Sequence, residues 1–342
     1  MHGAIEPAAL ASMLRPAVVA AAAACLPLVG GGDGDALDGA AVAAMRAALA
    51  DLALDGRVVV GEGEKDEAPM LHLGEPFGRA AAGDPAIDVA VDPVDGTRLA
   101  AAGRPGAMAV IAAAPRGAFF DLGPAHYLEK LVTWVPGFGV GGAGDRVAGR
   151  PLLELVPSLV AEAALARGVA PGEIRIAVQD RPRNRPYVDA VRAAGAQAEL
   201  FEHGDIERSL QALPGAAADP RPVPPRLDAV VGIGGAPEGV IVSGAVRALG
   251  GSMLARFAPQ SEGERGRVLA HLASSGAHPL EAVDALVDLD MLCAGPAALV
   301  LAAVTPCELG LALPGAELKA AGTRVHWWSA PGGHGWADLL DG

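Results

Sequence analysis

The sequence predicts an α/β protein, because segments with helical and strand-like patterns alternate along its 342 residues. Ala-rich segments with apolar residues at helical spacing indicate helices, whereas short apolar runs indicate strands. Gly- and Pro-rich breaks separate many of these segments. We expect helices near residues 6–29, 38–54, 184–194, 205–213, 236–249 and 261–274, and strands near 57–61, 86–92, 106–114, 130–135, 173–179, 197–201, 227–233 and 296–304.

The first predicted helix contains a segment that imitates a signal peptide or a lipoprotein anchor. Residues 17–29 are rich in alanine and contain Cys25 and Pro27. The segment is too short and too weakly apolar to be expected to span a bilayer. We therefore interpret it as a buried helix and expect no membrane partner.

Composition limits the possible partners and compartment. A formal charge of −14 and a pI near 5.0 argue against nucleic acid or an anionic membrane surface, because both would repel the protein. With 51% hydrophobic residues, the chain has enough apolar side chains for a packed core. Cys25, Cys293 and Cys307 are too few and too scattered for a disulfide framework or a zinc site. These observations favour a cytoplasmic protein.

Two predicted strands end in acidic residues. Asp92 and Asp95 follow the apolar run 86–91, and a second acidic burst begins at Glu62 after the run 57–60. Magnesium prefers carboxylate oxygens and leaves room for water and phosphate, and two such ions can serve displacement at phosphorus. The pattern predicts a magnesium-dependent phosphoryl site, although Asp92 and Asp95 could instead cap a helix.

Gly96 and Thr97 extend this prediction to the phosphate. If the chain turns from strand into helix at Gly96, backbone N–H groups and the Thr97 hydroxyl would point toward a phosphate.

A glycine-rich segment suggests a different functional class as an alternative to the phosphatase. Gly232-Ile233-Gly234-Gly235 follows a predicted strand and precedes a predicted helix, as in a dinucleotide-binding oxidoreductase. Pro237 occupies the place of the third glycine, and Glu238 would repel a pyrophosphate. The phosphatase interpretation is therefore favoured over this one.

Three segments together resemble the signatures of class II fructose-1,6-bisphosphatases: residues 61–71, 88–98 and 232–240. Residues 38–42, 127–131 and 181–183 fall in the family's order, so the resemblance spans roughly residues 30–260. It implies a layered α/β/α/β/α sandwich, as in the lithium-sensitive, metal-dependent sugar and inositol phosphatases. It also implies a phosphoric monoester hydrolase of carbohydrate metabolism (gluconeogenesis) that converts fructose 1,6-bisphosphate to fructose 6-phosphate.

The resemblance assigns roles to individual residues. The implied ligands of two or more Mg²⁺ or Mn²⁺ ions are Asp38, Glu62, Asp92, Asp95 and Glu238. The residues implied to act on the attacking water are Glu64, Asp66 and Thr97. The implied substrate contacts are Asp95, Gly96, Thr97, Tyr127, Arg181, Arg183 and Asp205, of which the two arginines would hold the distal phosphate and Asp205 the sugar hydroxyls. A homo-oligomer, either a dimer or a tetramer, is a further family expectation.

The chain also departs from the family pattern. Gly34 stands where the family has a lysine, Asn184 where a histidine is common, and His203 replaces the first aspartate of an Asp-Gly-Asp motif. These positions are expected to shape substrate contacts, and the similarity fades beyond about residue 275. Sedoheptulose 1,7-bisphosphate or another sugar phosphate as the substrate therefore remains an alternative, as does a catalytically silent paralogue.

Two stretches are candidate boundaries, namely the glycine-rich segment 137–144 and the proline-rich segment 214–225. We expect a metal-binding, catalytic lobe at residues 1–144 and a substrate-binding lobe at residues 145–342 that contributes one metal ligand.

Overall fold

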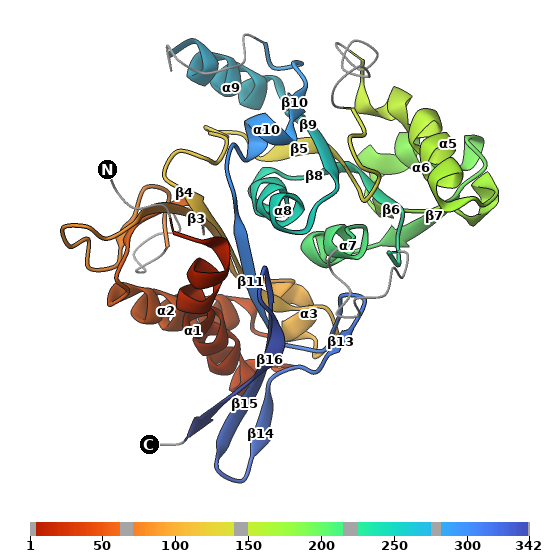
Figure 1. Cartoon of the computed structure of the whole chain (residues 1–342). Coiled ribbons are helices and arrows are strands. Elements are labelled where there is room, and N and C mark those ends of the chain that lie inside the picture. Colours follow the sequence, from red (N-terminus) through yellow and green to blue (C-terminus); the bar gives the residue numbers. More distant parts are fainter. Residues whose placement is uncertain (1–4, 62–70, 140–149, 215–224, 275–281, 341–342) are drawn as a thin grey trace. The chain divides into compact units, whose positions relative to one another are not determined.

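The computed structural model of the whole chain describes residues 5–61, 71–139, 150–214, 225–274 and 282–340 (Figure 1). The chain divides into two compact units, one formed by residues 1–119 and 295–342 and the other by residues 120–294. This division differs from the predicted lobes because the C-terminal strands pair with strands of the N-terminal segment. Helices and strands alternate in both units, which confirms the α/β class.

The helices in the described part of the chain are α1 (Pro7–Cys25), α2 (Gly34–Ala50), α3 (Thr97–Ala101), α5 (Val156–Arg167), α6 (Arg185–Ala193), α7 (Asp205–Gln211), α8 (Ala236–Leu249), α9 (Glu262–Ser274) and α10 (Leu289–Leu292), and the 3₁₀ turn η5 (Pro182–Asn184) precedes α6. The strands are β1 (Asp55–Val60), β2 (Pro76–Phe77), β3 (Ala86–Asp95), β4 (Met108–Pro115), β5 (Tyr127–Thr133), β6 (Arg175–Gln179), β7 (Gln197–Phe201), β8 (Ala229–Gly235), β9 (Ser252–Phe257), β10 (Val287–Asp288), β11 (Ala298–Ala303), β12 (Cys307–Glu308), β13 (Ala312–Leu313), β14 (Glu317–Lys319), β15 (Gly322–Ala330) and β16 (Gly333–Leu340).

The first unit is built on a mixed sheet with the strand order β14-β15-β11-β4-β3-β1-β2, in which β16 also pairs with β15. Strands β1 and β3 are parallel, and β4 is antiparallel to both β3 and β11. Helices α1 and α2 pack against each other and against this sheet. The acidic end of β3 is thereby supported by a central, well-buried strand.

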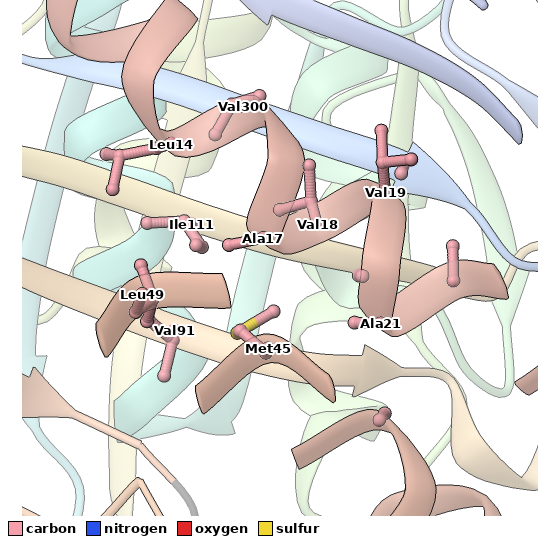
Figure 2. Packing of buried hydrophobic residues seen from close by; sticks show 14 of the residues in the cluster. Leu14, Ala17, Val18, Val19, Ala21, Met45, Leu49, Val91, Ile111 and Val300 are labelled. Carbon is pink, nitrogen blue, oxygen red and sulfur yellow. The ribbon is translucent and has the colours of Figure 1, made fainter. Parts of the chain in front are cut away.

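Helix α1 belongs to the core of the first unit. Figure 2 shows Leu14, Ala17 and Val18 of α1 beside Ile111 of β4 and Val300 of β11, and these side chains are fully or almost fully buried. Residues 7–28 nevertheless form a stretch of 22 residues in which the mean hydropathy of an 18-residue window reaches 1.8, so by length and composition alone this stretch could cross a membrane. The expectation of a segment too short and too weakly apolar concerned residues 17–29 alone, and α1 extends this segment toward the N-terminus. The packing of the helix supports the interpretation of a buried helix.

The second unit contains a mixed sheet with the strand order β10-β9-β5-β8-β6-β7. Strand β5 lies between β8 and β9 and is antiparallel to both, while β6 is parallel to β7 and β8. Its core joins residues of β5, β6 and β8 with α5 and α6. Parallel strands β6 and β8 end at the same edge of the sheet, where loops and helix starts gather polar residues.

Most predicted elements lie within a few residues of the observed ones. Among the described elements, the prediction missed α5, α10, the strands β2, β9 and β10, and the C-terminal strands β12–β16. Helix α2 begins four residues before the predicted start because Asp33 caps it, accepting a hydrogen bond from the backbone N–H of Ala36 at 3.0 Å. The predicted boundary segments 137–144 and 214–225 lie largely outside the described residues.

Candidate active site

The acidic end of β3 is a bulged strand that turns into a short helix. Asp92 pairs with Val110 and Asp95 with Met108, so the strand carries one extra residue between them. Gly96 then adopts a φ of +83° directly before α3, a conformation that disfavours a side chain. Asp92 Oδ1 accepts a hydrogen bond from the backbone N–H of Val94 at 3.0 Å, which fixes the orientation of its carboxylate.

Thr97 connects this turn to helix α2. The Thr97 hydroxyl lies 2.8 Å from Asp38 Oδ1 and 3.0 Å from the carbonyl oxygen of Val94. A Cβ atom on Gly34 would lie 3.2 Å from the methyl group of Thr97. The structure thus brings Asp38 into contact with Thr97. A lysine at position 34, as in the family pattern, would have its Cβ atom next to Thr97.

The donor atoms at this turn suit a hard divalent cation. Asp38, Asp92 and Asp95 offer carboxylate oxygens, and Thr97 offers a hydroxyl. The described residues nevertheless contain no group of three His, Cys, Asp or Glu side chains close enough to hold an ion. Glu62, Glu64 and Asp66 fall within residues 62–70, outside the described part of the chain.

In the second unit, the end of β8 organises a set of polar side chains. Cβ atoms at the glycines of this segment would collide with neighbours. At Gly234 a Cβ would lie 2.7 Å from Asp205 Oδ2, and at Gly235 it would overlap the Glu238 carboxylate. The glycines therefore make room for carboxylates of this chain, which explains the glycine-rich pattern without a bound dinucleotide.

Arg183 and Tyr127 lie together at this end of the sheet. The Arg183 guanidinium stacks over the Tyr127 ring with its central carbon 4.7 Å from the ring centroid. Arg183 also donates to the carbonyl oxygen of Ile233 at 3.2 Å and to Gln179 Oε1 at 3.3 Å. Arg181 is turned elsewhere, since it donates to the carbonyl oxygens of Asp180 and Glu202 at 2.8 Å each.

Asn184 is bound to strand β8 and to the end of β6 by its own side chain. Its side chain is buried and accepts a hydrogen bond from the Ile233 N–H at 2.8 Å. Its amide group donates to the carbonyl oxygens of Gln179 and Ile233, both at 3.1 Å. Asn184 therefore holds the turn that carries Arg183 against strand β8.

Asp205 and Glu238 influence each other electrostatically. Asp205 begins α7 directly after Gly204, which adopts a φ of +85°. Burial raises the pKa of the Glu238 carboxyl, and the negative charge of Asp205 raises it further. The backbone N–H of Glu238 and the positive charges of Lys130 and Arg183 oppose this shift. A cation beside Glu238 would likewise favour its ionised form.

Sequence reasoning missed Lys130. This side chain is only 2% exposed and forms an ion pair with Asp205. The signal was available, because a lysine within a predicted strand, 130–135, is unusual if that strand is central and buried.

Two comparisons with known proteins agree with these observations. A family model described as "Bacterial fructose-1,6-bisphosphatase, glpX-encoded" matches residues 8–326, and so extends well past the point where the similarity was expected to fade. Three relatives share the name "D-fructose 1,6-bisphosphatase class 2/sedoheptulose 1,7-bisphosphatase" and come from Prochlorococcus marinus strains MIT 9313 and MIT 9303 and from Synechococcus sp. strain CC9311. Each is 38% identical over 231 residues, which are 68% of this chain and 63% of the relative. The chain thus spans about 63% of the length of the curated relatives that it matches.

Proposed function

Because the chain belongs to the glpX-encoded bacterial fructose-1,6-bisphosphatase family, we propose that it hydrolyses the 1-phosphate of fructose 1,6-bisphosphate, yielding fructose 6-phosphate and phosphate. The observation that carries this proposal is the contact between Thr97 and Asp38 beside the acidic end of β3. The names of the relatives make sedoheptulose 1,7-bisphosphate the second candidate substrate. We place the enzyme in the cytoplasm and expect a dimer or tetramer.

The family is metal-dependent, and the oxygen donors of this chain fit Mg²⁺ or Mn²⁺. When bound, such ions would add positive charge beside the phosphoryl oxygens and activate a water molecule. The residues proposed to hold two or more ions are Asp38, Glu62, Asp92, Asp95 and Glu238. The bulge of β3 supports this role for Asp92 and Asp95, since it sets their spacing at the strand end.

Thr97 is proposed to orient the attacking water or the reacting phosphate. Its hydroxyl proton is directed to Asp38 Oδ1 or to the Val94 carbonyl, so its oxygen can accept a hydrogen bond from water. Glu64 and Asp66 are proposed to receive or orient the water proton. The backbone turn at Gly96 would let the phosphate approach the main chain closely.

Arg183 is the best-supported of the residues proposed to hold the distal phosphate. Its stacking on Tyr127 and its hydrogen bonds to Ile233 and Gln179 keep the guanidinium in one orientation, as phosphate recognition requires. Asp205 is proposed to accept hydrogen bonds from sugar hydroxyls. Arg181 is proposed as the second arginine that holds this phosphate, and its guanidinium is oriented by the carbonyl oxygens of Asp180 and Glu202.

The decisive experiment measures phosphate release from fructose 1,6-bisphosphate, sedoheptulose 1,7-bisphosphate, fructose 1-phosphate and inositol 1-phosphate, each with Mg²⁺, Mn²⁺ or EDTA. We expect metal-dependent release that favours the two sugar bisphosphates and stops with EDTA. Preference for another ester would mean that Gly34 and the other departures redirected specificity. Binding of metal without release from any ester would identify a catalytically silent paralogue.

A further inference from the structure

Lys130 is buried where a lysine is costly. It lies on β5, between β8 and β9, and only 2% of its side chain is exposed. Removing an ammonium group from water carries a penalty of several kcal/mol, and a buried ion pair seldom repays it in stability. The presence of a lysine at this buried position is therefore better explained by a role in function than by a contribution to stability.

The ammonium group is directed at one carboxylate. Lys130 Nζ donates to Asp205 Oδ2 at the start of α7. The other oxygen, Oδ1, accepts no hydrogen bond from any residue that the structure describes, and 10% of the Asp205 side chain remains exposed. The ion pair thus anchors one oxygen of Asp205 and leaves the other able to accept a hydrogen bond from a ligand.

The backbone around the pair is shaped to hold it. Lys130 pairs with Gly232 in the β5–β8 register, and Gly234 is its diagonal neighbour. A Cβ atom on Gly234 would lie 3.1 Å from Lys130 Nζ and 2.7 Å from Asp205 Oδ2. The remaining cavity beside them has a volume of about 10 Å³, which leaves room for at most one water molecule. A larger residue at position 234 would push the pair apart.

We infer that Lys130 is a positioning residue, which holds the Asp205 carboxylate in the orientation that accepts hydrogen bonds from the hydroxyls of a sugar phosphate. This inference rests on the proposed function, which assigns sugar hydroxyls to Asp205. Lys130 itself does not touch the substrate. Its removal would leave the Asp205 carboxyl group without its anchor and free to rotate, and would weaken the binding of sugar phosphates without affecting ligands that lack a sugar.

The test is a double-mutant cycle on the full-length protein, with fructose 6-phosphate titrated calorimetrically in EDTA so that no metal or turnover is needed. We expect Lys130→Met and Asp205→Asn each to raise the Kd about tenfold, the scale of one charge-assisted hydrogen bond. The double variant should bind no more weakly than Asp205→Asn alone, because Lys130 acts through Asp205. Binding of inorganic phosphate, which has no sugar hydroxyl, should be unchanged. Lys319→Met is the matched control, since Lys319 is exposed and pairs with Glu317 in the other unit.

A second variant keeps the inference testable if Lys130→Met does not fold. Gly234→Ala retains both charges but should displace them, and we expect it to weaken fructose 6-phosphate binding to a similar degree. Gly266→Ala, where an added Cβ meets no atom within 4 Å, is its control. An unchanged Kd in Lys130→Met or Gly234→Ala would overturn the inference. So would a Kd in the double variant that is raised by the product of the two single-variant factors.

The outcomes separate this inference from the proposed function. If the unaltered protein releases no phosphate from any ester but shows the expected binding cycle, the proposed hydrolysis is wrong and the role of Lys130 stands. If it releases phosphate while Lys130→Met binds normally, the proposed hydrolysis stands and the inference is wrong. If the unaltered protein does not bind fructose 6-phosphate, the inference is wrong. If it also releases no phosphate from any ester, the proposed function is wrong as well.

Discussion

The Thr97 hydroxyl lies 2.8 Å from Asp38 Oδ1, although the two residues are 59 positions apart. Thr97 begins the short helix after β3, and Asp38 lies in the second turn of α2. The contact joins the acidic turn of β3 to α2 of the same unit. It keeps the Asp38 carboxylate, a proposed metal ligand, next to the Thr97 hydroxyl, which is proposed to orient the attacking water or the reacting phosphate.

Thr97→Val removes the Thr97 hydroxyl but keeps the shape of the side chain, so it tests the hydroxyl alone. We expect kcat for the best substrate to fall on the order of 10²-fold, because the oriented hydroxyl is lost while the β-branched shape stays. Thr97→Ser should retain most of the activity. Thr323→Val, on strand β15, is the control and should leave kcat unchanged; a similar loss in both valine variants would contradict the role of Thr97.

Asp92→Asn should abolish turnover without unfolding the protein. The asparagine oxygen can still accept the hydrogen bond from Val94, so the β3 turn is preserved. Replacing a charged oxygen ligand of the proposed cation should lower kcat by about 10³-fold or more. Thermal unfolding should stay within about 1 °C of the unaltered protein, because the hydrogen bond that holds the turn is kept. Asp84→Asn is the matched control, since Asp84 is a half-buried residue whose carboxylate accepts a hydrogen bond from the backbone N–H of Ala81 in the 81–84 turn. Retained activity in Asp92→Asn would refute the proposed site.

Asn184→Ala should destabilise the second unit. It would leave the backbone of Ile233 and the Gln179 carbonyl without the hydrogen bonds that Asn184 now supplies. We expect the free energy of unfolding to fall by about 2 kcal/mol, measured by urea denaturation. Arg185→Ala, at the exposed neighbouring position, should change it by less than about 0.5 kcal/mol. An unchanged midpoint for Asn184→Ala would show that these hydrogen bonds are replaced by water.

Tyr187 should remain protonated in alkaline solution. Burial raises the pKa of its phenol, and Glu129, which accepts its hydrogen bond, raises it further. Between the unfolded pKa of about 10 and the higher folded pKa, the folded state keeps a proton that the unfolded state has lost. Stability should therefore be fully present below pH 10 and decrease as pH rises above it.

This prediction can be measured on a single residue, because Tyr127 and Tyr187 are the only tyrosines. In a Tyr127→Phe variant, the absorbance at 295 nm reports Tyr187 alone. We expect no phenolate signal from the native variant at pH 10.5, and half-ionisation near pH 10 once urea unfolds it. A native titration centred near pH 10 would contradict the buried pair.

The sequence predicted the parts of the site that depend on neighbouring residues. The acidic end of β3, the turn at Gly96 and the family itself follow from short motifs, because local patterns carry strand ends and tight turns. The pairings of Thr97 with Asp38, Arg183 with Tyr127 and Lys130 with Asp205 were not predictable, since they join segments 56 to 75 positions apart.

By itself, the sequence determined the α/β class and the apolar residues of the buried core, because hydrophobic periodicity expresses these locally. It also predicted a role for the acidic residues from their type and spacing. Only the tertiary structure decided that the C-terminal strands join the first sheet and that Asn184 faces inward. It also decided that Gly234 gives space to a buried ion pair. These features depend on which side chains the strands bring together across the sheet, and strand pairing over long separations leaves no periodic signal in the chain.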